Sequence, residues 1–283
     1  MNFLFYRSQT QRSRIIFEAV QAGLAKLGHS IRLKHENEYA GVEADVAVHY
    51  GLWGNLRTIQ QDYARAGRKS VLIDLGYWGR VDGGKLAGYH RFVVNARHAT
   101  AYFQRVKHGP DRFRQFGIEP QPFAQATGSI VLLAGMSGKA AWVYGLEPQE
   151  WEKRAAAELR ASTSRRIYYR PKPSWKEAAP IEGTIFADWK NVPVEQMLSD
   201  CWAVVTHHGN TALDALVAGV PAFCVEGLAS VLCRSELSWI ERPAYPDEGA
   251  RDQLLYDAAW TQWKVDEIAA GAAFRYLFDE GLL

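Results

Sequence analysis

Three short polar segments, each following an apolar run, have the residue types of phosphate-binding loops. The first follows residues 129–133 and contains Gly135, Ser137, Gly138 and Lys139. Backbone N–H groups of a glycine-rich loop can hold phosphate, and the lysine adds a positive charge. It is not a Walker A loop, because only two residues separate Gly135 from the Gly138-Lys139 pair and an alanine follows the lysine. An ordinary turn from strand to helix is the alternative.

The second segment follows residues 166–169 and places Arg170 and Lys172 two positions apart, each followed by a proline. Proline holds the backbone extended, so side chains at alternate positions share one face. Both cations could therefore reach one diphosphate. A solvated basic turn is the alternative.

The third segment follows the apolar residues 203–205 and precedes a helical pattern over residues 211–218. It contains His207, His208, Gly209, Asn210 and Thr211. The start of a helix directs unpaired N–H groups and the positive end of the helix dipole at a nearby anion, and Thr206 or Asn210 could cap it. Adjacent histidines point to opposite sides of a strand, so we expect a phosphate or sugar contact and no metal site.

A different chemistry is suggested by Asp74, which ends the predicted strand 70–74. Partial desolvation beside aromatic residues would raise the pKa of this carboxyl toward that of a general base. Tyr77 and Trp78 offer flat faces to a sugar or an extruded base, and Arg80 closes the loop. A helix cap or a salt bridge to Arg80 is the alternative role for Asp74. Further candidates for acceptor contacts follow the next strand, and they are Asn95, Arg97 and His98.

The elements that would position these residues alternate between strand and helix. Apolar runs predict strands over residues 2–6, 31–33, 44–49, 70–74 and 91–94, and again over 129–133, 166–169, 203–205 and 222–225. Helical spacing links many of them, which favours an α/β protein with parallel sheets covered on both faces. The proline-containing residues 117–127 predict a linker between two such halves, with a cleft between them.

Composition limits the partners and the compartment. Residues 1–124 carry a net charge of +8 and residues 125–283 carry −6, which suggests that the first half faces a polyanion. The three cysteines lack metal-ligand spacing and read as buried thiols in a reducing compartment. No apolar run of about 20 residues is present, so we expect a cytoplasmic protein without a membrane span.

Together these segments carry a family resemblance. Residues 206–216, followed by Gly219-Val220-Pro221, resemble the donor-site signature of GT-B glycosyltransferases. With residues 74–80, 135–139, 170–173 and Gln262-Trp263, the chain resembles, over nearly its whole length, bacteriophage glycosyltransferase-like proteins.

The resemblance implies two Rossmann-like domains: an acceptor-binding domain over residues 1–120 and a nucleotide-sugar-binding domain over residues 128–262. Residues 263–283 would form a tail helix that packs back on the first domain. The donor would be a UDP-sugar, with no resident cofactor or metal. Its diphosphate would be neutralised by Arg170, Lys172, Lys139 and the backbone of residues 209–211, and Glu226 is the candidate for the ribose. Asp74 would deprotonate the acceptor hydroxyl in an inverting displacement.

The acceptor implied by this resemblance is a hydroxymethylated pyrimidine in phage DNA, in the host cytoplasm. The target base would have to leave the duplex to meet Asp74. The alternatives are a transferase acting on a surface saccharide or small molecule, a nucleotide-sugar epimerase, and a nucleotide-sugar- or DNA-binding module without catalysis. The sequence does not indicate the sugar or the oligomeric state.

Overall fold

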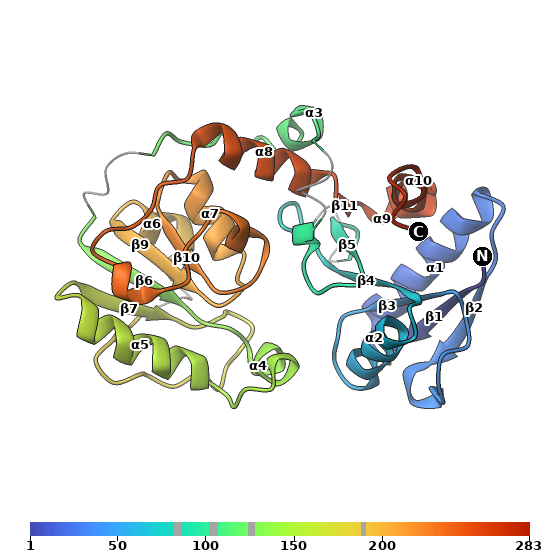
Figure 1. Cartoon of the computed structure of the whole chain (residues 1–283), viewed down its shortest axis with the longest axis horizontal. Helices are drawn as coiled ribbons and strands as arrows, with labels where there is room; N and C mark the ends of the chain where they lie inside the picture. Colours follow the sequence, from blue (N-terminus) through green and yellow to red (C-terminus); the bar gives the residue numbers. More distant parts are fainter. Residues whose placement is uncertain (82–85, 102–106, 124–127, 188–190) are drawn as a thin grey trace. The chain divides into compact units, whose positions relative to one another are not determined.

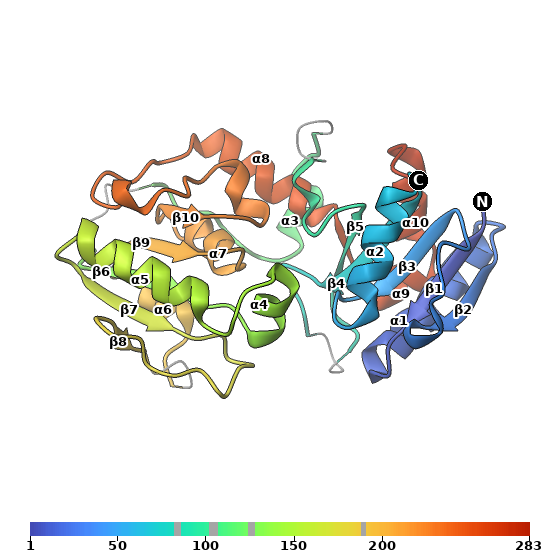
Figure 2. The same ribbon diagram turned by 60° about the horizontal axis from the view of Figure 1, so that its bottom comes forward.

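The computed structural model describes residues 1–81, 86–101, 107–123, 128–187 and 191–283. The chain divides into two compact units (Figures 1 and 2). Unit 1 comprises residues 1–116 and 256–283, and unit 2 comprises residues 117–255. Residues 124–127 of the expected linker lie outside the described residues.

Unit 1 contains a six-stranded sheet in the order β11-β5-β4-β3-β1-β2. Its strands are β1 (Phe3–Arg7), β2 (Ile31–His35), β3 (Val46–Tyr50), β4 (Lys69–Leu75), β5 (His90–Val94) and β11 (Gln262–Trp263). Its helices are α1 (Gln11–Lys26), α2 (Asn55–Arg65), α3 (Asp111–Arg114), α9 (Val265–Ala269) and α10 (Ala272–Asp279), with short 3-10 turns at Glu36–Glu38 and Ala99–Ala101. The long helix α8 (Glu248–Ala259) begins in unit 2 and ends in unit 1.

The apolar pattern explains why these elements form. Strand β1 is almost fully buried, and α1 follows it after a tight polar turn in which the Thr10 side chain accepts a hydrogen bond from the Ser13 backbone N–H. The buried face of α1 contains Ile16, Val20 and Leu24 at helical spacing. On the opposite face of the sheet, Leu56, Ile59 and Tyr63 of α2 pack in a second apolar cluster.

Strand β5 departs from the all-parallel sheet that alternation predicts. It runs antiparallel to β4, with Asp74 opposite Arg91, and β11 in turn pairs antiparallel with β5. A parallel neighbour needs a crossover connection, usually a helix, whereas an antiparallel neighbour can follow a simple reversal. No helix is present in the described parts of the connection from residue 76 to residue 89.

The C-terminal tail packs on α1 within unit 1, and Figure 1 shows α9 and α10 beside this helix. The contact is closest at Gly23, where an added Cβ would lie 2.1 Å from the backbone oxygen of Ile268. Only a residue without a side chain allows the two helices to approach this closely.

We therefore expect Gly23→Ala to lower the free energy of unfolding by about 2 kcal/mol. Alanine favours a helix over glycine by about 1 kcal/mol, but forcing a methyl group into packed backbone costs about 3 kcal/mol. Urea unfolding measures the difference. The control is Gln21→Ala at an exposed position of the same helix, which should change stability by less than about 0.5 kcal/mol. A stabilised Gly23→Ala protein would contradict the close contact.

Unit 2 contains a five-stranded, wholly parallel sheet in the order β10-β9-β6-β7-β8. Its strands are β6 (Ile130–Ala134), β7 (Arg166–Arg170), β8 (Ile185–Phe186), β9 (Cys201–Thr206) and β10 (Ala222–Cys224). Its helices are α4 (Gly138–Tyr144), α5 (Glu150–Ser162), α6 (Val194–Leu198) and α7 (Thr211–Val217), with 3-10 turns η3 (Leu228–Val231) and η4 (Leu237–Trp239).

One layer of the core of unit 2 lies between this sheet and α5. Val131, Leu133 and Val205 of the sheet pack with Ala156 and Leu159 of the helix, and all five are buried. Figure 2 shows α5 lying along the sheet. Because α5 is anchored in this way, side chains on its first turn have fixed positions at the carboxyl edge of the strands.

Candidate functional site

The strand order of unit 2 creates a topological switch point between β6 and β9. From β6 the chain continues to β7 and β8 on one side, and it then returns to β9 and β10 on the other side. In open α/β sheets, ligands bind outside the carboxyl ends of the strands at such a point. The loops after β6 and β9 are two of the three segments that the sequence singles out for phosphate binding.

The loop after β6 is built into the sheet on one side and into α4 on the other. The Gly135 backbone N–H donates to the Arg170 backbone oxygen at 2.9 Å, which joins this loop to the end of β7. Ser137 caps α4 by accepting a hydrogen bond from the Ala140 backbone N–H. Gly138 begins the helix, and Lys139 is exposed on its first turn.

The loop after β9 is held by one side-chain bond and a group of aromatic rings. The Thr206 hydroxyl accepts from the Gly209 backbone N–H at 3.1 Å. Asn210 precedes α7 without making a side-chain cap, and Thr211 is the first residue of that helix. Neither of the two residues that the sequence suggests as caps therefore caps α7 with its side chain, and Thr206 instead fastens the turn before the helix.

The two histidines join the β9 loop to the helices that follow β6. His207 is buried, with its ring 4.5 Å from Tyr144 of α4 and 5.5 Å from Trp151 of α5, measured between ring centroids. His208 lies 4.7 Å from the same tyrosine. The Nδ1 atoms of the histidines are 3.1 Å apart, so one ring donates and the other accepts. These contacts tie the β9 loop to the C-terminal end of α4 and to α5, and the pairing of Thr206 with Ala134 places the start of this loop beside the loop after β6.

Arg170 completes the group from β7, while Lys172 is exposed two residues further on. The Arg170 guanidinium is half-buried, and its Nη2 donates to the Val192 backbone oxygen at 3.4 Å. Burial lowers the pKa of Arg170, and the carboxylates of Glu195 and Asp214 oppose that shift. Asp214 lies on α7, so Arg170 interacts electrostatically with the helix that follows the β9 loop. The sequence did not single out Asp214.

Glu226 follows β10, the strand beside β9. Its backbone N–H donates to the His207 backbone oxygen at 2.6 Å. Its Oε2 atom is buried, and no residue in the described ranges bonds to it. Glu226 therefore lies beside the β9 loop, where it could accept a ligand hydroxyl.

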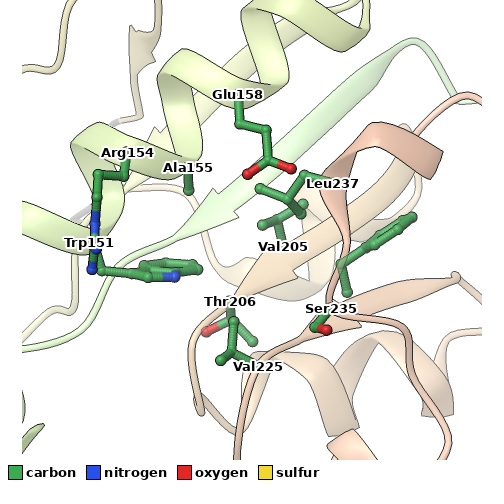
Figure 3. A pocket seen from close by; sticks show the side chains of 10 residues that line it. Trp151, Arg154, Ala155, Glu158, Val205, Thr206, Val225, Ser235 and Leu237 are labelled. Atoms are coloured by element: carbon green, nitrogen blue, oxygen red, sulfur yellow. The ribbon is translucent and has the colours of Figure 1, made fainter.

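A pocket of about 300 Å³ lies next to these loops on the α5 face of the sheet (Figure 3). Its lining combines apolar and charged side chains, namely Trp151, Arg154, Ala155, Glu158, Val205, Thr206, Phe223, Val225, Ser235 and Leu237. Only Thr206 belongs to the predicted phosphate segments. Across the described residues, no group of three or more His, Cys, Asp or Glu side chains is arranged to hold a metal ion.

In unit 1, Asp74 is paired with Arg91 on the neighbouring antiparallel strand. Their Oδ2 and Nη2 atoms are 3.2 Å apart, and the carboxylate is 39% exposed. Arg91 also contacts His98, with 3.4 Å between Nη1 and Nδ1, and its Cζ lies 5.8 Å from the centre of the Tyr77 ring. Asp74, Tyr77 and His98 are therefore brought together by a residue that the sequence did not single out. Only the antiparallel register reveals it.

The aromatic side chains of the loop after β4 are buried and not exposed to solvent. Tyr77 and Trp78 are 3% and 8% exposed, and Trp78 lies against Phe113 and Phe116. The Gln262 side chain of the tail accepts from the Tyr77 backbone N–H at 2.6 Å, which explains why the loop turns inward. The structure thus does not present these rings as free faces for a sugar.

The remaining acceptor candidates have different positions. The Arg80 side chain donates to the backbone oxygens of Gly76 and Tyr77, so it closes its own loop. Asn95 lies at the opposite edge of the sheet from Asp74, because β5 is antiparallel. There its Oδ1 accepts from the Ser70 backbone N–H at 2.7 Å. Arg97 is half-buried in the turn that follows.

Two further polar residues of unit 1 lie near Asp74. The Arg12 guanidinium of α1 contacts the Tyr50 hydroxyl at 3.5 Å. Burial raises the pKa of Tyr50, and the charges of Asp74, Arg12 and Arg91 all act on it. The carboxyl edge of β3 and β4 therefore carries two guanidinium groups beside one carboxylate. No spacing in the sequence links Arg12 to Arg91, since α1 and β5 are far apart along the chain.

Unit 1 should lose stability in mild acid. Burial lowers the pKa of His49 and His90 from 6.5 to about 4. Each histidine takes up a proton below about pH 6.5 in the unfolded state, but only near pH 4 in the folded state. Protonation therefore favours the unfolded state between these two values, so the free energy of unfolding is highest above pH 6.5 and falls toward pH 4. Each shift corresponds to about 3 kcal/mol.

The measurement is the free energy of urea unfolding between pH 7.5 and pH 4.5. Asparagine can keep a hydrogen bond like those from the ring Nδ1 atoms to the backbone oxygens of Gly51 and Gly88, so His49→Asn with His90→Asn should flatten the acid slope. An equally steep slope in this double variant would assign the acid sensitivity to other groups.

Comparison with known proteins gives a match in structure only. No family model matches the sequence, and no curated protein matches it. The chain is similar in fold to the β-Kdo 2,4-transferase of Thermosulfurimonas dismutans KpsC, with a TM-score of 0.54, 12% identity, and coverage of 94% of this chain and 97% of that one. It is also similar to the β-Kdo 2,7-transferase of the same KpsC, with a TM-score of 0.50, 10% identity, and coverage of 97% and 99%.

The chain has a GT-B fold. This confirms the fold predicted from the sequence, two Rossmann-like α/β units, except that β5 of unit 1 pairs antiparallel with both β4 and β11. At 12% and 10% identity, the similarity supports the fold alone. The reaction is inferred below from the residues of the site. Every helix in the described ranges is too short or too polar to cross a lipid bilayer.

Proposed function

We propose that this GT-B protein is a glycosyltransferase that moves a sugar from a nucleotide-sugar donor to a hydroxyl acceptor. The observation that carries the proposal is the joining of three cationic or glycine-containing loops at the switch point of unit 2. The Gly135–Arg170 backbone bond links two of them, and the third starts beside the first because Thr206 of β9 pairs with Ala134 of β6. The match to two transferases in fold is consistent with it.

In this proposal the donor diphosphate lies against the loops of unit 2. Negative charge develops on the leaving nucleotide as the glycosidic bond breaks, and fixed cations stabilise that charge without a metal. Arg170 supplies the best-positioned charge, because it is half-buried and held at Val192, whereas Lys139 and Lys172 are exposed. Glu226 is the candidate for a donor hydroxyl. A UDP-sugar is the first donor to test.

Asp74 of unit 1 is the proposed general base toward the acceptor hydroxyl. Direct attack of that hydroxyl on the anomeric carbon would invert the configuration there, with the proton passing to the carboxylate and the nucleotide diphosphate leaving. The 39% exposure of the Asp74 carboxylate leaves it accessible. Arg91 would orient it through the ion pair.

The acceptor that we propose first is hydroxymethylated pyrimidine DNA. Unit 1 carries a net charge of +6 in its folded boundaries, against −4 for unit 2. A DNA-binding unit 1 would lose affinity steeply as salt rises, because phosphate contacts release counterions. The test is fluorescence anisotropy with a hydroxymethylcytosine duplex at two salt concentrations. Affinity that is absent, or insensitive to salt, would remove DNA as the acceptor.

One experiment tests the activity and separates the alternatives. The protein is incubated with a panel of nucleotide sugars and either hydroxymethylated DNA or saccharide acceptors. The panel includes a Kdo-terminated saccharide, because the two transferases of similar fold are named for Kdo. Mass spectrometry of nucleosides and glycans identifies the product. A new sugar on one acceptor supports the proposal. Conversion of a nucleotide sugar without any acceptor would indicate an epimerase, and donor binding without turnover would indicate a binding module.

A further inference from the structure

A buried carboxyl group lies directly behind the loop that follows β6. Glu152 is on the first turn of α5, and it is fully buried. Its Oε1 accepts a hydrogen bond from the Met136 backbone N–H at 2.7 Å. Charged residues are almost never fully buried without a partner. The other buried positions of α5 are filled by apolar residues, so the helix does not need an acid here in order to pack.

The loop is shaped to fit this carboxyl group. An added Cβ on Gly135 would lie 3.2 Å from the Glu152 Oε1 atom and 2.9 Å from the Tyr169 ring. A side chain at residue 135 would therefore push the loop away from α5. The Tyr169 hydroxyl is in turn contacted by the Gln149 Nε2 atom at 3.2 Å. The loop thus packs against three buried polar side chains, those of Gln149, Glu152 and Tyr169.

The second oxygen of Glu152 makes no bond to any residue in the described ranges, although it is buried. Burial raises the pKa of Glu152, and the hydrogen bond from Met136 opposes this shift only in part. Burial also raises the pKa of Tyr169, so the neighbouring phenol is neutral. A protonated Glu152 would support the loop without placing a negative charge behind a phosphate-binding segment. Glutamine would then be a close substitute for it.

We propose that Glu152 is a positioning residue that holds residues 135–138 in the conformation that binds the donor phosphate. This inference rests on the proposed donor site in unit 2. Glu152 acts through the Met136 N–H and does not touch the donor. Fixing that N–H fixes the backbone immediately before Ser137, whose side chain caps α4.

The test compares Glu152→Gln with Glu152→Met. Glutamine keeps an oxygen that can accept from Met136, whereas methionine keeps the volume and removes the acceptor. The binding of UDP is measured by calorimetry, and KM for the donor and kcat are measured in the transfer assay. We expect Glu152→Met to weaken UDP binding and raise the donor KM by about tenfold, with kcat at saturating donor within about threefold. For Glu152→Gln, the affinity for UDP, the donor KM and kcat should each stay within about threefold of the wild-type values.

The control is Lys153→Met on the exposed side of the same helix, which should bind UDP like the wild type. A second measurement needs no substitution: the Met136 amide should exchange with deuterium slowly, as expected for an N–H bonded to a buried carboxyl. Exchange at the rate of an open loop would overturn the inference even if Glu152→Met does not fold.

The remaining outcomes are distinct. If the wild type binds UDP and Glu152→Met binds it equally well, the positioning role is wrong and the donor site stands. If the wild type binds none of the nucleotides in the panel, the proposed donor site fails and the role of Glu152 fails with it. A fall in kcat with an unchanged donor KM would place the effect of Glu152 outside donor binding.

Discussion

Replacing Arg170 with methionine should lower kcat for sugar transfer by about 10²–10³-fold, because this substitution removes the best-positioned cation of the proposed diphosphate site. Removal of one preorganised group that stabilises developing charge typically has an effect of this size. Arg170 qualifies because it lies at the end of β7, is half-buried, and is held by the Val192 backbone oxygen. Charges in such partly desolvated positions act more strongly than those in water. Methionine retains much of the aliphatic stem, so the fold should be preserved.

The measurement is kcat and the donor KM at saturating acceptor, together with UDP binding by calorimetry. The matched control is Arg166→Met, since Arg166 is exposed at the opposite end of the same strand and its Nη2 donates to the Ser129 hydroxyl. It should stay within about twofold of the wild type, as surface substitutions away from a site usually do. If kcat falls equally in both variants, the arginines stabilise the sheet, and Arg170 has no particular role at the leaving group.

The second large effect is expected for Asp74→Asn, which should lower kcat by about 10²–10⁴-fold because the amide cannot accept the proton of the acceptor hydroxyl. Asparagine keeps the shape of the side chain and leaves an oxygen facing Arg91. UDP binding should be unchanged, because the proposed donor site lies in unit 2. The pH dependence of kcat at saturating substrates reports the base, and its acid limb should disappear in the variant.

The control for this variant is Asp111→Asn, which changes an exposed carboxylate of unit 1 whose ion pair is a 3.7 Å contact with Arg114. It should leave transfer unchanged. Transfer by Asp74→Asn at the rate of the wild type would show that the pair of Asp74 with Arg91 is structural. A melting temperature well below that of the wild type would lead to the same conclusion, because the lost activity would then follow from lost stability. Melting temperatures should therefore be measured together with the kinetics.

Much of the arrangement of the candidate site in unit 2 could be predicted because its residues follow strands that run in parallel. The carboxyl ends of such strands meet at one edge, so segments far apart in the sequence arrive together. Gly135, Arg170 and His207 obey this rule, because Ala134 at the end of β6 pairs with Arg170 on one side and with Thr206 on the other. A local sequence pattern carries such information because it identifies both the strand and its end.

The partners behind the loops could not be predicted in the same way. Glu152 lies on a helix whose pattern marks the position as buried but does not say what it faces. Its contact with Met136 depends on how α5 packs on the sheet. Thr206 was one of two possible caps, and only the turn geometry selects its hydroxyl for the Gly209 N–H.

In unit 1, alternation and apolar runs predict β1 to β5, but they miss β11 and do not give the direction of β5. Direction depends on the connection and on pairing with β4, which are properties of the folded sheet. That direction moves Asn95 to the far edge and sets Arg91 opposite Asp74. The burial of Tyr77 and Trp78 is likewise decided by Gln262, a residue of the tail. Local periodicity and the placement of glycine, proline and charge thus predict the two α/β units and the candidate phosphate loops, and the motif resemblance adds the GT-B fold. The side chains beside Asp74 and those that hold the loops emerge only in the folded protein, because their contacts join distant segments whose register and packing no local pattern encodes.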